Sequence, residues 1–377
     1  MKTPMRLETL FVHAGHHIDK ETGAIAPPIH LSTTFARDAG NELIGPSQYI
    51  REGNPTQSLL EEALIPLEGG AAALVFASGM AAGTALLQSL PPGSHVVLPD
   101  DVYYGYRVAL KDFLTGWGYT FTEAAMNDLA ALEKAIRKET RLVWLESPSN
   151  PLMKISDLAA GAALARKAGA ISVVDNTFAT PVLQRPLDLG ADVVLHSTTK
   201  YMGGHSDLQG GALIFKEKGD LYEKVLHVRH ILGGVGSPFN SWLALRGLRT
   251  LPVRVERQSA NALAVAKAMA AHPAILAVHY PGLESDPGHA VAKRQMKAFG
   301  GMLSLRIKAG REAAVRAVGR VQLFSRATSL GSVESLIEHR ATSEGAGSKT
   351  SPDLLRLSIG LEHADDLIAD LDRALGG

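Results

Sequence analysis

Residues 171–213 read ISVVDNTFATPVLQRPLDLGADVVLHSTTKYMGGHSDLQGGAL, and this stretch decides the fold. It contains two mainly apolar runs of strand length, Ile171 to Val174 and Asp192 to His196, and each run is followed directly by polar residues. Such runs are typical of parallel strands that are buried on both faces. Polar residues at the C-ends of these strands face the ligand crevice of an open α/β sheet. The stretch therefore predicts a binding site that contains Asp175 and Lys200.

These two side chains suit a particular kind of cofactor. A lysine amine can form a Schiff base with an aldehyde, and a carboxylate can hold a proton on a basic ring nitrogen. Asp175 ends the first run, and Lys200 closes the segment Ser197-Thr198-Thr199-Lys200 after the second. The alternative is that Lys200 is an ordinary surface lysine after a buried strand. Further motif matches along the chain disfavour this alternative.

The stretch resembles the lysine-attachment motif of the Cys/Met-metabolism family of pyridoxal-phosphate-dependent enzymes, and further matches follow in order along most of the chain. Members include cystathionine γ-synthase, cystathionine γ- and β-lyases, methionine γ-lyase and O-acyl-homoserine sulfhydrylases. The resemblance implies pyridoxal 5'-phosphate as the cofactor. It also implies the fold-type-I architecture, an α/β fold with an N-terminal arm and a smaller C-terminal α+β domain.

Composition and length agree with an enzyme of this kind. A chain of 377 residues is too long for one ordinary core, so two domains are expected. Lysine plus arginine and aspartate plus glutamate both number 38, so no net field favours nucleic acid. The absence of cysteine excludes disulfides and a thiol nucleophile. Because neither a signal peptide nor a membrane-spanning run is present, we expect a cytoplasmic enzyme.

The chain divides into three expected parts. Residues 1–48, with prolines at 27, 28 and 46, form an irregular arm. Residues 49–245 form the cofactor-binding α/β domain, because strands and helices alternate from 72 to 215, which favours a mainly parallel, doubly wound sheet. Residues 246–377 form an α+β domain, which a long helical stretch at 240–271 links to the first. No G-x-G-x-x-G turn with a following acid is present, which counts against a nicotinamide cofactor.

Three segments are candidates for holding the cofactor. The turn Ser78-Gly79-Met80 opens a helix after a short strand, where free N–H groups and the helix dipole can seat a phosphate. It matches the family's Ser-Gly-Met phosphate loop. The resemblance implies that Tyr49 and Arg51 reach the cofactor phosphate of a neighbouring subunit. It also implies that Asn150, in an Asn-Pro turn, binds the phenolic oxygen of the cofactor.

An aromatic ring at a strand end can stack on a flat cofactor. We assign this role, and a proton shuttle to the leaving group, to Tyr103. Tyr104 stands where the family has a glycine, and the loop is one residue shorter before Arg107, so Tyr104 and a role for Arg107 stay open.

The family motifs imply the remaining roles. Lys200 and Asp175 carry the chemistry, and Ser197 and Thr199 lie on the phosphate or the lysine. In the C-terminal domain, Arg356 and Ser329 orient the substrate α-carboxylate, and Glu334 matches a position used by γ-enzymes. The segment after it, Ile337 to Glu344, departs from the family pattern Pro-Ala-x-x-(Ser/Thr)-His at the entrance to the substrate site. Histidine spacing predicts no metal site.

These residues favour a cystathionine γ-synthase or γ-lyase, a C–S lyase or γ-replacement transferase acting on cystathionine or O-acyl-homoserine. Glu334 supports this choice, whereas Gln48 before Tyr49 weakens it, because γ-enzymes often have an acid there. A cystathionine β-lyase is the close alternative; methionine γ-lyase and O-acyl-homoserine sulfhydrylase are less favoured. An aminotransferase and a cofactor-binding regulator are rivals from other classes. The resemblance implies a homotetramer built from active dimers.

Overall fold

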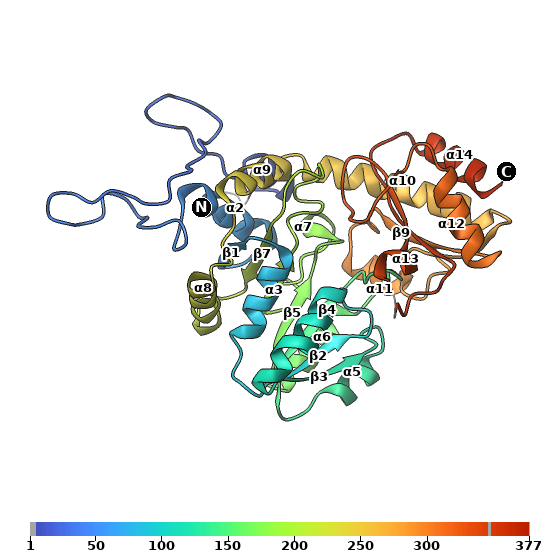
Figure 1. The fold of residues 1–377 in the computed structure, drawn as a ribbon, viewed down its shortest axis with the longest axis horizontal. Helices are drawn as coiled ribbons and strands as arrows, with labels where there is room; N and C mark the ends of the chain where they lie inside the picture. The colour runs from blue at the N-terminus through green and yellow to red at the C-terminus, as the bar shows by residue number, and fades with distance from the viewer. Residues whose placement is uncertain (1–4, 346–347, 377) are drawn as a thin grey trace.

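The structure is a computed structural model that describes residues 5–345 and 348–376. Two sheets lie side by side in it, and the N-terminal segment loops away from the larger one (Figure 1). None of the helices in the described ranges is long and apolar enough to cross a bilayer.

The larger sheet has seven strands: β1 (Ala72–Phe76), β2 (His95–Pro99), β3 (Thr120–Ala124), β4 (Thr140–Glu146), β5 (Ile171–Asp175), β6 (Val193–His196) and β7 (Gly211–Phe215). Their order across the sheet is β1-β7-β6-β5-β4-β2-β3. All neighbours pair in parallel except β7, which runs antiparallel to both β1 and β6. The predicted mainly parallel, doubly wound sheet is therefore confirmed.

Helices cover both faces of this sheet, so its central strands are buried on both sides. One face carries α2 (Pro55–Glu68), α5 (Leu129–Ala135), α6 (Leu158–Lys167), α7 (Thr180–Leu183) and α9 (Pro238–Leu248). The other carries α3 (Gly79–Gln88), α4 (Tyr104–Val108), the π-helix Ala109–Phe113, the 3-10 helix Leu114–Trp117 and α8 (Asp220–Leu232).

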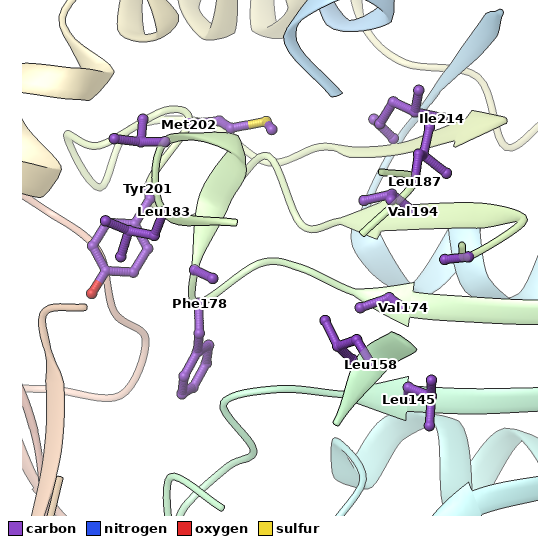
Figure 2. Packing of buried hydrophobic residues seen from close by; sticks show 14 of the residues in the cluster. Leu145, Leu158, Val174, Phe178, Leu183, Leu187, Val194, Tyr201, Met202 and Ile214 are labelled. Atoms are coloured by element: carbon purple, nitrogen blue, oxygen red, sulfur yellow. The ribbon is translucent and has the colours of Figure 1, made fainter. Parts of the chain in front are cut away.

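Side chains alternate between these two cores along each strand. Val173 belongs to the core of the α3 face, whereas its neighbour Val174 belongs to the core of the α2 face. Figure 2 shows Val174 beside Val194 and Ile214, which come from the next two strands and point to the same face. Burial on both faces explains why these strands read as continuous apolar runs in the sequence.

Local signals define the ends of the helices that open the cofactor-binding part. The Asn54 side chain accepts a hydrogen bond from the Thr56 N–H, and Pro55 takes the first helical position of α2. Gly69 ends α2 with a φ of 76°, a left-handed conformation that favours glycine. Ser78 caps α3 by accepting from the Ala81 N–H, which fixes the turn after β1.

The predicted helical stretch at 240–271 is two helices, because α9 ends at Leu248 and α10 (Leu251–Ala271) begins after Arg249 and Thr250. Pro252 lies in the first turn of α10, where its missing N–H cannot continue the preceding helix. The domain boundary predicted between residues 245 and 246 lies within α9, and the division itself stays a prediction.

The smaller sheet has the order β10-β11-β12-β9-β8 and lies against α10. Its strands are β8 (Ile275–His279), β9 (Met302–Ile307), β10 (Ser325–Arg326), β11 (Leu336–His339) and β12 (Leu354–Ser358). Its helices are α11 (His289–Gln295), α12 (Gly310–Arg320), α13 (Arg340–Glu344) and α14 (Ala364–Leu375). This mixed architecture confirms the predicted α+β character of the C-terminal part.

The N-terminal segment is not wholly irregular, because it contains α1 (Leu7–Val12), whose Phe11 is buried in the core of the α2 face. The prediction missed this helix because six residues give too short a pattern to read. Beyond it, Ile25, Leu31 and Ile44 expose about two thirds or more of their surface. Apolar side chains on an extended arm are typical of a segment that packs on another molecule.

Candidate active site

A cavity of about 440 Å³ opens at the C-terminal edge of the larger sheet and is closed on its other side by the smaller sheet. It receives the residues that follow β1, β2, β4, β5 and β6, as expected for an open α/β fold. Of the residues predicted to form the site, those lining this cavity are Ser78, Gly79, Met80, Tyr103, Asn150, Asp175, Ser197, Thr199, Lys200, Ser329 and Arg356.

Three predicted residues lie outside the cavity of their own chain. Tyr49 is 41% exposed, and the guanidinium of Arg51 lies 5.5 Å from the centre of its ring. Arg51 also donates to the His230 carbonyl at 3.0 Å. Glu334 accepts hydrogen bonds from the hydroxyls of Ser206 and Ser332, both at 2.7 Å.

Lys200 is held in the cavity by Ser329, which lies between β10 and β11 of the smaller sheet. Its Nζ donates to Ser329 Oγ at 2.7 Å. Ser329 has a φ of 79°, a left-handed conformation that is rare outside glycine and is often found at functional sites. Burial, with the nearby charge of Arg356, lowers the pKa of Lys200 to about 8. An amine with this pKa is partly neutral near pH 7, so it can act as a nucleophile and a base.

Asp175, the last residue of β5, lines the same cavity. Its Oδ1 accepts from the Thr177 N–H at 3.0 Å, and Thr177 Oγ1 accepts in turn from the Ser197 N–H at 2.9 Å. Burial raises the pKa of Asp175, while hydrogen bonds from Thr177 and the charge of His196 act in the opposite direction. Burial and the neighbouring Asp175 also raise the pKa of Glu146 well above its usual range.

A buried network of three polar side chains lies next to Asp175 in the structure. His196, the last residue of β6, contacts Glu68 Oε1 through Nε2 at 2.5 Å, and both side chains are almost fully buried. The Asn176 amide donates to the same carboxylate oxygen at 3.0 Å. Because Asn176 follows Asp175 directly, this network fixes the backbone that presents the Asp175 carboxylate to the cavity.

The turn before α3 has the features of a phosphate seat. Ser78 caps the Ala81 N–H, and within the described residues the N–H groups of Gly79 and Met80 have no recorded protein acceptor. A Cβ at Gly79 would lie 3.0 Å from Ser197 Cβ, so the glycine lets the two segments approach closely. The Thr199 hydroxyl donates a hydrogen bond to the Gly210 carbonyl at 3.2 Å and accepts one from the Gly210 N–H at 3.0 Å.

These features fit pyridoxal 5'-phosphate. The free N–H groups at a helix N-terminus suit its phosphate. Among the described residues neither Asp175 nor Glu146 forms an ion pair, so a protonated ring nitrogen would supply the cation that this acidic pocket lacks. Lys200 supplies the amine for its aldehyde.

Arg356 lines the same cavity and is 4% exposed. Its Nη1 donates to Asn150 Oδ1 at 3.0 Å, and its Nη2 donates to the Ser329 carbonyl at 2.9 Å. It also forms an ion pair with the buried Glu338. These contacts fix the guanidinium, which suits bidentate binding of a carboxylate.

Tyr103 and Tyr104 both line the cavity and are 46% and 60% exposed. Tyr106 is buried, and its hydroxyl donates to the Gly79 carbonyl at 2.6 Å. Arg107 lies outside the cavity, where it donates to the Asp100 carbonyl at 2.7 Å and pairs with Glu123 at 2.6 Å. The open question about Arg107 therefore has a structural answer, since it braces the loop that carries Tyr103.

Sequence reasoning missed several lining residues. Thr177 could have been found, because it stands two positions after Asp175 at the end of a strand. Arg340 and Glu344 lie in the segment that departs from the family pattern, so the departure was the only signal.

Known proteins resemble this chain over almost its whole length. The model of the family described as "Cys/Met metabolism PLP-dependent enzyme" matches residues 8–376. A cystathionine gamma-synthase of Mycobacterium bovis is 48% identical over 374 residues, which cover 98% of this chain and 96% of that protein. A cystathionine beta-lyase of Coxiella burnetii is 41% identical over 378 residues, covering 98% and 97%. The structure of cystathionine gamma synthase from Xanthomonas oryzae pv. oryzae, in complex with aminoacrylate and cysteine, superimposes with a TM-score of 0.94 at 42% identity, covering 99% of this chain and 98% of that one.

Proposed function

The chain belongs to the Cys/Met metabolism family of pyridoxal-phosphate-dependent enzymes, and from this premise we propose that it carries out γ-chemistry on a sulfur amino acid. The preferred reaction is γ-replacement, in which cysteine displaces the acyl group of an O-acyl-homoserine to give cystathionine. The related γ-elimination, cleaving cystathionine to cysteine and 2-oxobutyrate, uses the same residues. The proposal rests mainly on the 48% identity to a cystathionine gamma-synthase over nearly the whole chain.

Pyridoxal phosphate, when bound, supplies an aldehyde that captures amino groups and a protonated ring that accepts electrons released at the substrate Cα. We propose that Asp175 holds the proton on the ring nitrogen, since it lines the cavity that Lys200 also lines. Ser78, Gly79, Met80, Ser197 and Thr199 are proposed to hold the phosphate.

Lys200 is the proposed base. Its partly neutral amine removes the proton from the substrate Cα and, in γ-chemistry, a second proton from Cβ. Tyr103 is proposed to lie on the cofactor ring and to give a proton to the leaving oxygen or sulfur, because its side chain lines the cavity from the loop after β2.

Arg356 is proposed to bind the substrate α-carboxylate. Its hydrogen bonds to Asn150 and the Ser329 carbonyl, with the ion pair to Glu338, hold the guanidinium at the cavity wall. A carboxylate bound there would lie beside Ser329, whose hydroxyl also contacts Lys200. Asn150 is proposed to serve the cofactor's phenolic oxygen as well.

The site is proposed to be completed by a second copy of the chain. Tyr49 and Arg51 lie outside the cavity of their own chain, on the segment that exposes Leu31 and Ile44. We infer that this segment crosses to a neighbouring subunit and presents both residues to its cofactor phosphate, in a dimer that pairs into a homotetramer. Glu334 is retained as a proposed substrate residue, although it contacts Ser206 and Ser332.

The lowered pKa of Lys200 predicts how apoenzyme takes up its cofactor with changing pH. Only the neutral amine attacks an aldehyde, and with a pKa of about 8 roughly one molecule in ten is neutral at pH 7. The uptake rate should fall about tenfold per pH unit below 8 and level off above it.

Stopped-flow absorbance measures this rate. The same measurement on Nα-acetyl-lysine serves as the reference, and dividing by its rate removes the effect of the titration of pyridoxal phosphate itself. A profile that keeps rising to pH 10, as the reference does, would contradict the assignment.

Product analysis tests the reaction. The holoenzyme should form cystathionine from cysteine and an O-acyl-homoserine, and should release 2-oxobutyrate when cystathionine alone is supplied. Mass spectrometry separates these from homocysteine and pyruvate, the products of β-cleavage. If pyruvate is the dominant keto acid and no cystathionine is made from an O-acyl-homoserine, the proposed function is wrong and the enzyme is a β-lyase.

A further inference from the structure

A second arginine lies on the substrate side of the cavity. Arg340, the first residue of α13, lines it together with Arg356 and Lys200 and is only 9% exposed. It belongs to the segment, Ile337 to Glu344, that departs from the family pattern. The roles proposed above leave this cation without a function, although it lines the cavity beside two residues that have one.

Two carboxylates orient the Arg340 guanidinium. Its Nε donates to Glu344 Oε1 at 2.9 Å, and its Nη1 donates to Glu338 Oε1 at 3.1 Å. The other oxygen of Glu344 accepts from the hydroxyls of Ser348 at 2.5 Å and Thr350 at 2.7 Å, so this carboxylate is itself fixed. Within the described residues Nη2 has no recorded partner. The arginine is therefore held in place with one donor group still available.

Arg356 and Arg340 lie on the same wall of the cavity, and each can bind a different carboxylate. Glu338 touches both Arg356 and Arg340, so it prevents their mutual repulsion and holds them on one wall. Arg356 is assigned to the α-carboxylate. A planar guanidinium beside it, with free N–H donors, favours a second carboxylate on the same substrate rather than an ammonium or an apolar group.

The other arginine near the ring tyrosines cannot take this ligand. Arg107 is bound to the Asp100 carbonyl and to Glu123, and it does not line the cavity. Arg340 is thus the cation of the cavity wall that remains for the far end of a substrate.

We propose that Arg340 binds a carboxylate at the distal end of the acyl group, so that the enzyme selects an O-succinyl-type ester of homoserine over the O-acetyl ester. This inference rests on the proposed γ-replacement and deepens it. Arg340 is a specificity residue in this scheme, since it contacts the leaving group and not the carbons at which protons move.

The test compares two esters in holoenzyme, O-succinyl-L-homoserine and O-acetyl-L-homoserine, each with L-cysteine, by the rate of cystathionine formation. Wild type should have the higher kcat/KM for the succinyl ester. Arg340→Gln should lower the succinyl-to-acetyl ratio of kcat/KM by about 10- to 100-fold, the range expected for a lost charge-assisted hydrogen bond. Arg340→Lys should fall between them, because it keeps the charge without the fork.

The matched control is Arg316→Gln, because Arg316 is an exposed arginine on α12 that pairs with the exposed Glu312 and does not line the cavity. It should leave the ratio unchanged. An equal loss with both esters in Arg340→Gln would assign Arg340 a structural role and overturn the inference. Wild type that prefers the acetyl ester would overturn it too, while leaving γ-replacement intact; no cystathionine from either ester would remove both.

A measurement on wild type alone covers the case in which both Arg340 variants fail to fold. Monomethyl succinate should compete with the succinyl ester at concentrations at least about tenfold below those needed for methyl butyrate, its uncharged counterpart of similar length. Equal inhibition by the two would contradict a distal carboxylate site.

Discussion

Lys200→Ala is expected to lower the turnover of any amino-acid substrate by about 10⁴-fold or more, because it removes the general base and the covalent anchor of the cofactor together. The lysine amine is the group in the cavity best suited to both tasks, since its pKa is lowered to about 8 and Ser329 fixes its position. The purified variant should also lose the visible absorbance band that wild-type holoenzyme acquires with pyridoxal phosphate.

Two controls make this result specific. Lys216→Ala removes an exposed lysine just after β7 and should leave the band and the turnover unchanged. Methylamine added to Lys200→Ala should restore part of the turnover, because a small amine can enter the space that the side chain leaves. A variant that keeps both the band and the activity would show that another amine binds the aldehyde.

The sheet could be predicted from the sequence because its strands are buried on both faces. Val173 and Val174 belong to opposite cores, so both must be apolar, and the polar residues that follow them stand out. Asp175, Lys200 and the Ser78 turn were found for this reason: each lies at the C-terminal end of a strand or within a few residues of it, where the fold gathers side chains.

Other parts of the site depend on contacts that no local pattern reports. Glu68 meets His196 across 128 positions, and Arg340 is oriented by Glu338 of β11 and Glu344 of the short helix α13. Burial of these groups is decided by the packing of whole elements against one another, which a short stretch of sequence does not show. The helix α1 and the break between α9 and α10 were missed for a related reason, since one is too short to show a period and the other turns on a single proline.

Asp175→Asn is expected to lower kcat by about 10²- to 10⁴-fold, as removal of one partner from a buried charge pair costs about 3–5 kcal/mol. The substitution keeps the size of the side chain and an oxygen that can accept from the Thr177 N–H, so the cavity should keep its shape. It removes the negative charge that is proposed to keep the ring nitrogen protonated. Because Lys200 is intact, the variant should still bind pyridoxal phosphate and keep an absorbance band.

The cofactor itself offers the decisive control for this variant. An N-methylated pyridoxal phosphate carries a fixed positive charge on the ring nitrogen and needs no carboxylate to maintain it. Reconstitution with this analogue should raise the kcat of Asp175→Asn toward that of wild type, while offering wild type no gain. Since burial raises the pKa of Asp175, a cation opposite the carboxylate stabilises its ionised form, so the charge pair should act in both directions. Failure of the analogue to restore any activity would mean that Asp175 serves the site through position rather than charge.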